Sequence, residues 1–183
     1  MEKNIALIAL FAAVIAALGL IPKITLGFGV PITAQTLGVM LCGTVLGARR
    51  GTLSVLLFLL LVAIGLPLLS GGRGGLGAFA TPSAGCLLGW PIGAVVTGWI
   101  VEKWRGAPLG VVATVAAIIG SIVVMYVFGI AGLAVALDKS LSEAAFLVLV
   151  FVPGDVIKAV IAGLLTAALF KSRPASVLSR YDG

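Results

Sequence analysis

Long uninterrupted runs of apolar residues restrict the fold of this chain more than any other feature of its sequence. Six such runs can be placed, with lengths that scatter around the roughly 20 residues that a membrane-spanning helix needs. Their approximate ranges are 4–21, 32–46, 52–69, 85–101, 109–137 and 144–170. Because apolar and polar residues do not alternate within the runs, they favour helices over a β-barrel. We therefore predict one all-α integral membrane domain over residues 1–183, a compact bundle of six transmembrane helices.

The overall composition supports a membrane protein and excludes several classes of function. Charged residues make up 10% of the chain and hydrophobic residues 61%, whereas soluble domains carry about 25% charged residues. The chain has no histidine, which excludes metal sites and acid–base catalysis that depend on histidine. Cys42 and Cys86 lie far apart in apolar runs. We expect them to be packing residues, with no disulfide and no metal site.

The positive charge of the chain predicts its orientation. The net charge of +6 does not indicate nucleic-acid binding, because lysine and arginine in membrane-protein loops set the topology. With the N-terminus inside, the inner side would carry Lys3, Arg49, Arg50, Lys103, Arg105, Lys171, Arg173 and Arg180, and the outer side Lys23, Arg73 and Lys139. Since cytoplasmic loops carry the excess, both termini are predicted to be cytoplasmic. The first run exceeds the about 7–15 apolar residues of a signal peptide, so we expect a retained helix.

Two opposite charges lie inside the sixth apolar run. Asp155 and Lys158 are three residues apart, which places them on one face of a helix. Pro153 and Gly154 precede them and should bend or loosen that helix. Each charge costs roughly 2.5–3.5 kcal/mol at the centre of a membrane helix, so both need partners. Three interpretations remain open: a mutual salt bridge, a proton relay, or a small ligand with donors and acceptors. A metal cation fits poorly because Lys158 would repel it.

Two irregular connections are predicted on the outer side. Residues 22–31 contain bracketing prolines and two glycines, which forbid a regular helix. Residues 70–85 are rich in glycine but lack the G-x-x-x-x-G-K-[ST] pattern of a nucleotide site. The glycine-rich segment is either a flexible connector or a loop that closes over a site. In the second case Arg73 would donate to a carbonyl or a carboxylate.

The first apolar run carries small residues at a regular spacing. Ala9, Ala13 and Ala17 repeat every four residues, and Ala12 and Ala16 form an adjacent row. Such rows let helices approach closely in lipid. They indicate either packing within the bundle or docking to a separate membrane protein.

Several short motifs follow one another along the chain in a distinctive order. They are Val30-Pro31-Ile32-Thr33-Ala34-Gln35, Leu46-Gly47-Ala48-Arg49-Arg50-Gly51, the segment 65–75, Thr81-Pro82-Ser83-Ala84-Gly85 and Pro153-Gly154-Asp155-x-x-Lys158. In this order and spacing they resemble the BioY family, the substrate-binding (S) components of biotin transporters of the energy-coupling factor (ECF) type. The resemblance extends over nearly the whole chain.

The resemblance implies a six-helix S-component fold in a bacterial cell (inner) membrane, with a high-affinity biotin site open to the outer face. Asp155 and Lys158 match the family's polar ligands. Arg73 falls where the family's loop supplies another polar group, sometimes asparagine. Within residues 80–86 the family often has a tyrosine that this chain lacks, so no contact is carried over to that position.

The chemistry of biotin agrees with these residues. Asp155 can accept from the ureido N–H groups, and Lys158 can donate to the ureido carbonyl or to the carboxylate tail. Apolar pockets with a few placed polar groups are typical of small-molecule sites. By position, four aromatic residues are expected to cover the bicycle: Phe28, Phe79, Trp90 and Tyr126.

The resemblance also implies partners. The row of Ala9, Ala13 and Ala17 matches the surface by which S components dock on a transmembrane coupling subunit. Because the chain has no nucleotide site, ATPase subunits of an ECF module would supply the energy. Biotin is then a transported substrate rather than a cofactor, and the remaining contacts are with membrane lipid. We expect capture from outside, closure of both outer loops and release inward.

Three other functions stay open from the residues alone. The first is an S component for another vitamin, with the same fold and a different pocket. The second is a proton-coupled carrier that works without partners. The third is a small membrane enzyme with Asp155 as general base and Lys158 as electrophile, although no nucleophile or metal cluster accompanies them.

Overall fold

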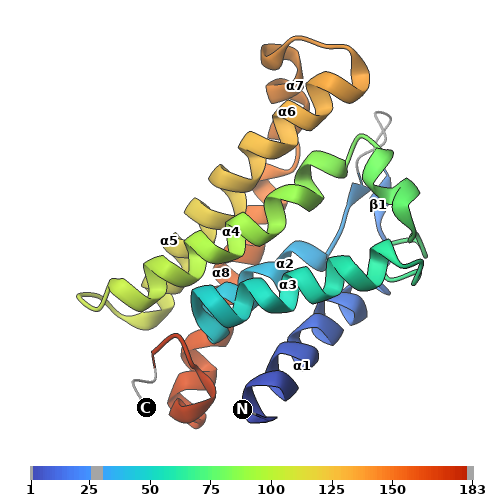
Figure 1. The fold of residues 1–183 in the computed structure, drawn as a ribbon. Helices are drawn as coiled ribbons and strands as arrows, with labels where there is room; N and C mark the ends of the chain where they lie inside the picture. The colour runs from blue at the N-terminus through green and yellow to red at the C-terminus, as the bar shows by residue number, and fades with distance from the viewer. Residues whose placement is uncertain (1, 26–30, 181–183) are drawn as a thin grey trace.

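The protein is described here by a computed structural model, which covers residues 2–25 and 31–180 and is mostly helical (Figure 1). The α-helices are α1 (Glu2–Leu18), α2 (Gln35–Leu41), α3 (Gly47–Ala63), α4 (Ala84–Lys103), α5 (Leu109–Ile118), α6 (Met125–Leu137), α7 (Leu141–Leu149) and α8 (Val152–Ser172). Shorter elements are the π-helical segments η1 (Cys42–Leu46) and η3 (Ile119–Val124), the 3-10 turns η2 (Leu76–Ala80) and η4 (Pro174–Ser176), and the strands β1 (Ile24–Thr25) and β2 (Pro31–Ile32). The predicted all-α membrane class is therefore confirmed.

Four helical segments of the described chain are long and apolar enough to cross a membrane. They are Gln35–Ala63, Ala84–Lys103, Leu109–Leu137 and Val152–Ser172, and the apolar part of α1 is shorter. The first segment is folded back on itself at Gly47, whose φ of +84° is favourable only for glycine. A Cβ placed on Gly51 would collide with the carbonyl oxygen of Cys42. In a straight helix these two residues would lie about 13 Å apart along the axis, so the chain turns back between them. The number of six spans stays a prediction.

The helix within the sixth apolar run is interrupted, as expected from Pro153. Helix α7 ends at Leu149 and α8 begins at Val152, with Pro153 in its first turn. Proline is favourable there because the first N–H groups of a helix have no internal partner. At the other end of α7, Ser140 and Glu143 form a capping box. The hydrogen bonds from Ser140, with a smaller contribution from Lys139, hold the pKa of the Glu143 carboxyl below its ordinary value.

Helix α4 is held tightly at the centre of the bundle. A Cβ placed on Gly93 would lie 2.8 Å from the carbonyl oxygen of Gly120 in η3. One helical turn further along α4, a Cβ on Gly43 in η1 would lie 2.8 Å from Cβ of Thr97. Glycine at these two positions lets the π-helical segments approach α4 at backbone distance, which agrees with the use of small residues between membrane helices.

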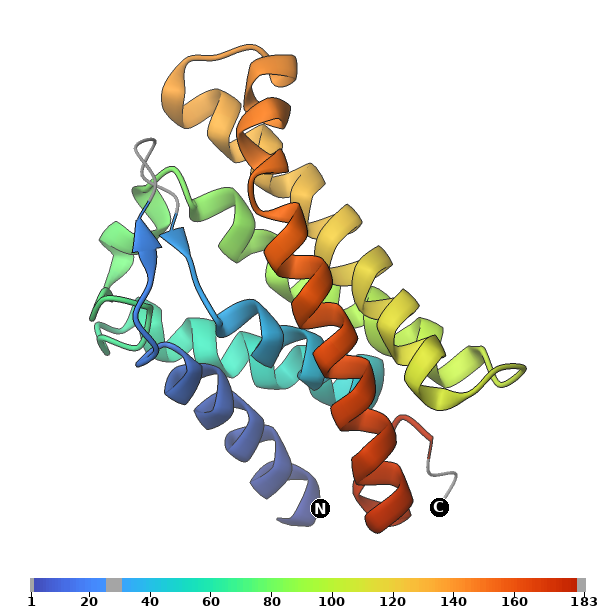
Figure 2. The same cartoon turned by 180° about the vertical axis from the view of Figure 1, so that it is seen from behind.

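The two ends of the bundle differ in character. The start of α1 and the end of α8 lie at one end, and the β1–β2 pair and the α6–α7 connection lie at the other (Figures 1 and 2). At the first end, Ser179 donates its backbone N–H to Val45 and its hydroxyl to the carbonyl of Thr44. Arg180 donates to the carbonyl of Trp104 at 2.7 Å. The C-terminal segment thus connects η1 with the residue that follows α4.

Candidate functional site

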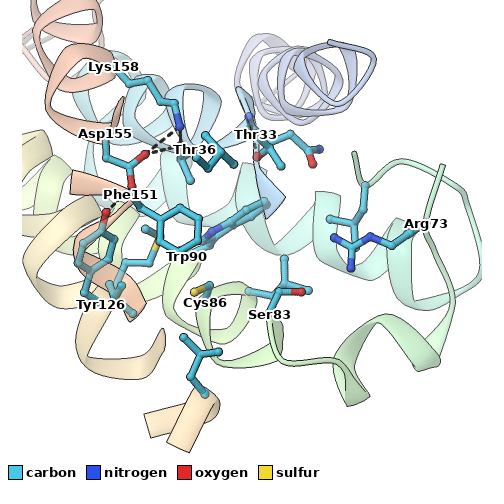
Figure 3. Close-up of a pocket in the computed structure, with 17 residues that line it drawn as sticks. Thr33, Thr36, Arg73, Ser83, Cys86, Trp90, Tyr126, Phe151, Asp155 and Lys158 are labelled. Atoms are coloured by element: carbon cyan, nitrogen blue, oxygen red, sulfur yellow. Dashed lines mark hydrogen bonds and ion pairs between the residues drawn. The ribbon is translucent and has the colours of Figure 1, made fainter. Parts of the chain in front are cut away.

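A cavity lies between α2, α4, α6, α7 and α8 and the turn at residues 69–73 (Figure 3). Its empty volume is about 650 Å³, a figure that includes the open space at its mouth. The wall is mostly apolar and carries a few polar groups. Its residues are Ile32, Thr33, Gln35, Thr36, Leu69, Arg73, Ser83, Cys86, Leu87, Trp90, Met125, Tyr126, Leu133, Val148, Phe151, Asp155 and Lys158.

The Asp155 carboxylate accepts three side-chain hydrogen bonds in this wall. Its carboxylate projects from the first turn of α8 and is only 4% exposed. Oδ1 accepts from Lys158 Nζ at 2.8 Å and from the Thr36 hydroxyl at 3.2 Å. Oδ2 accepts from the Tyr126 hydroxyl at 2.6 Å. The break between α7 and α8 places this carboxylate at the cavity, and three helices supply its hydrogen bonds.

Lys158 completes the same cluster. Its ammonium forms the salt bridge with Asp155 and also donates to the Thr36 hydroxyl at 3.0 Å. The predicted mutual salt bridge is therefore confirmed, and it forms part of a larger network. The side chain of Lys158 is 16% exposed, against 6% for Asp155, so both members of the pair are largely buried. We call Thr36, Tyr126, Asp155 and Lys158 the polar cluster.

Arg73 lies across the cavity from the polar cluster. In Figure 3 its guanidinium points into the space from the opposite wall, with Trp90 and Phe151 between it and Asp155. The turn that carries it is closed by two backbone hydrogen bonds between Leu69 and Arg73, at 3.0 and 3.2 Å. The cavity therefore has a cluster with donors and acceptors at one end, an apolar middle and a cation at the other end.

Gln35 anchors the turn that carries Arg73. It is 1% exposed, and its amide nitrogen donates to the carbonyls of Ile15 at 3.1 Å and Leu68 at 3.0 Å. Its amide oxygen accepts from the backbone N–H of Ser70 at 2.9 Å. One side chain thus connects α1, α2 and the turn, and holds one wall of the cavity in place.

The structure brings together five of the seven residues predicted to bind the ligand: Asp155, Lys158, Arg73, Trp90 and Tyr126. The indole N–H of Trp90 is buried and has no hydrogen-bond partner among the described residues, so it can serve a ligand. Phe79 does not line this cavity; it packs on the core and borders a separate depression beside Phe128. Phe28 lies outside the described residues.

Sequence reasoning missed Thr36 and the anchoring role of Gln35. Both are polar residues in an otherwise apolar run, which is the signal that could have identified them. Tyr126 was predicted as an apolar cover, whereas its hydroxyl bonds directly to Asp155. Cys42 and Cys86 are both free thiols, as predicted. No group of three or more metal-binding side chains occurs within residues 2–25 and 31–180.

The alanine rows on α1 differ in exposure. Ala12 is buried in the core and Ala16 packs against it. Ala9, Ala13 and Ala17 are exposed along the helix. Within the described residues, the row of Ala9, Ala13 and Ala17 is therefore left exposed.

Comparisons with known proteins identify the family. The sequence pattern of the BioY family matches residues 2–175. The chain belongs to the BioY family. A biotin transporter BioY from Rhodobacter capsulatus is 50% identical over 98% of this chain and 100% of its own length. A biotin transporter BioY from Rhizobium etli is 56% identical over 94% of this chain and 95% of its own length.

A solved structure shares the fold as well. The crystal structure of an S component for biotin from an ECF-type ABC transporter matches with a TM-score of 0.88. It is 32% identical in sequence, over 93% of this chain and 92% of the other. The S-component fold implied by the motifs is therefore confirmed.

Proposed function

We propose that this chain is the biotin-binding S component of an ECF-type uptake transporter in a bacterial inner membrane. The observation that carries the proposal is the two-ended cavity, in a chain whose relatives are biotin transporters. Biotin has a ureido group at one end, an apolar bicycle in the middle and a carboxylate at the other end. This order matches the polar cluster, the apolar middle and Arg73.

The polarity of the two ends sets the direction of the ligand. A carboxylate placed at the polar cluster would meet the negative charge of Asp155, which opposes it. At the other end, Arg73 offers fork-shaped donors that suit a carboxylate. We therefore place the ureido group at Asp155 and Lys158 and the tail at Arg73. Trp90, Phe151 and Leu87 cover the bicycle between them.

The partner proposal follows from what the chain contains. It has no nucleotide-binding motif, so ATP would be used by ATPase subunits coupled through a transmembrane subunit. The exposed row of Ala9, Ala13 and Ala17 is a suitable docking surface, because small residues allow close helix approach in lipid. Six spans with both termini in the cytoplasm complete the proposal. Biotin is then captured outside and released inward without chemical change, so the chain is a transport subunit and not an enzyme.

The deciding experiment measures biotin binding to the purified full-length protein in detergent. A ligand that binds only the folded state raises thermal stability by an amount set by its concentration relative to Kd. We expect biotin to raise the unfolding temperature and other vitamins to leave it unchanged. A larger shift with another vitamin would reassign the substrate and keep the fold.

Replacing Arg73 with glutamine should weaken biotin binding by about 10- to 100-fold, as expected for the loss of one hydrogen-bonded charge pair. Biotinamide, which has no tail charge, should lose much less affinity in the same variant. Arg73→Lys keeps the charge without the forked donors, so its affinity for biotin should lie between those of the unchanged protein and of Arg73→Gln. Isothermal titration of both ligands makes the measurement, and an equal loss for biotin and biotinamide would contradict the placement of the tail.

A further inference from the structure

The hydrogen bonds within the polar cluster leave little capacity for a ligand. An ionised carboxylate offers about four acceptor positions, two on each oxygen. At Asp155, Oδ1 already accepts from Lys158 and Thr36, and Oδ2 accepts from Tyr126. One acceptor position, on Oδ2, therefore remains unused within the described chain.

The same count applies to the ammonium. Lys158 has three N–H donors, and two of them are directed to Asp155 and Thr36. The Thr36 hydroxyl uses its only proton toward Asp155 and accepts from Lys158. One donor of Lys158 therefore remains for a ligand. Within the described chain, the polar cluster therefore presents one unused acceptor position and one unused donor.

A single acceptor beside a single donor matches one edge of a cyclic urea. Such an edge consists of one N–H and the neighbouring carbonyl oxygen. The two N–H groups of a cyclic urea lie on opposite sides of the carbonyl, so one carboxylate beside an ammonium can meet only one of them. The remaining donor and acceptor fit this edge without breaking any bond seen in the cluster.

We propose that Thr36 and Tyr126 are positioning residues, which orient Asp155 and Lys158 so that the pair binds one N–H/carbonyl edge of the ligand's ureido group. The inference rests on the proposed biotin function and names the groups that set its selectivity. Thr36 comes from α2, Tyr126 from α6 and the charged pair from α8. Their hydroxyls fix the rotation of the carboxylate, which would otherwise turn to offer either oxygen.

Packing alone does not require these two hydroxyls. Valine has nearly the same shape as threonine, and phenylalanine nearly the same shape as tyrosine, and neither places a polar atom in an apolar wall. A purely structural role would therefore predict similar ligand selectivity after either replacement. A positioning role predicts that either replacement weakens the preference for hydrogen on one particular ureido nitrogen of the ligand. This preference can be measured separately from the stability of the protein.

The test uses two ligands that differ in the position of one methyl group. Biotin methylated on one or the other ureido nitrogen is titrated into the full-length protein, beside biotin itself. In the unchanged chain one isomer should stay within about 10-fold of biotin, while the other should lose about 100-fold or more, as expected for a lost hydrogen bond to a charged group. Equal affinity of the two isomers would overturn the proposal.

The variants then assign the effect to the hydroxyls. In Thr36→Val and in Tyr126→Phe the ratio of the two Kd values should fall by about 10-fold, because the carboxylate can turn. Thr36→Ser keeps the hydroxyl and should restore the ratio. Thr166→Val removes a buried hydroxyl of α8 that bonds to Thr44, away from the cavity, and should leave the ratio unchanged.

The outcomes separate this inference from the proposed function. If the unchanged protein binds no biotin, both fail. If it binds biotin and discriminates the isomers, but neither Thr36→Val nor Tyr126→Phe changes the ratio, the positioning role alone is overturned. Thermal unfolding of each variant verifies that it is folded, and should Thr36→Val not fold, Tyr126→Phe decides the result by itself.

Discussion

Replacing Asp155 with alanine should lower the affinity for biotin by about 100-fold or more and also destabilise the protein. The loss of affinity follows from removing the acceptor for the ureido N–H, since hydrogen bonds to charged groups contribute about 1.5–3 kcal/mol, and from releasing Lys158 and Tyr126, which position the site. The loss of stability follows because Lys158 would be left largely buried without its counter-charge, which costs about 3–5 kcal/mol.

A double variant separates these two effects. Changing both Asp155 and Lys158 to leucine removes the charges together, and replacing a buried ion pair by apolar residues is often neutral or stabilising. The double variant should recover the unfolding temperature and still fail to bind biotin. Titration with biotin and thermal unfolding in detergent measure both quantities. Recovery of binding in the double variant would show that the pair serves the fold and not the ligand.

The charged pair was the part of the site that the sequence predicted best. A carboxylate and an ammonium three residues apart in an apolar run are costly enough to demand a partner, and proline before them predicts the break that separates α7 from α8. Both signals are local, so they do not depend on how the rest of the chain folds. The cost of intramembrane charge made Asp155 and Lys158 visible without any structure.

The partners of that pair could not be predicted in the same way. Thr36 is separated from Asp155 by 119 positions along the chain. Its polarity within an apolar run marks it as a candidate but does not show which residue it contacts. Tyr126 was assigned a packing role because the sequence does not show where a hydroxyl points. Its bond to Asp155 depends on the position of α6 relative to α8, which is a result of tertiary packing.

The helical hairpin before the cavity shows a second limit. Helical residues continue from Gln35 to Ala63, and the chain turns within them at Gly47, where φ is +84°. Because glycine is also common inside membrane helices, its presence there did not locate the end of η1. The second apolar run was predicted to end near residue 46, and η1 ends at Leu46. The third was predicted to begin near residue 52, whereas α3 begins at Gly47.

Replacing Gln35 with leucine should destabilise the protein by about 3 kcal/mol or more. Leucine fills a similar volume but leaves the N–H of Ser70 and the carbonyls of Ile15 and Leu68 without the amide that they contact. Each buried polar group that loses its partner costs about 1–3 kcal/mol. The unfolding temperature measures this loss. Gln35→Asn retains the amide on a shorter side chain, so it should recover part of the stability and test whether reach matters.

The same change should alter binding at one end of the cavity. Gln35 holds the turn that carries Arg73, whereas the polar cluster is assembled by α2, α6 and α8. In Gln35→Leu, biotin should therefore lose more affinity than biotinamide, as in Arg73→Gln, because the carboxylate partner is displaced while the ureido partners stay. Equal losses for both ligands would mean that Gln35 supports the whole cavity. An unchanged unfolding temperature would mean that the three hydrogen bonds of its amide contribute little to the fold.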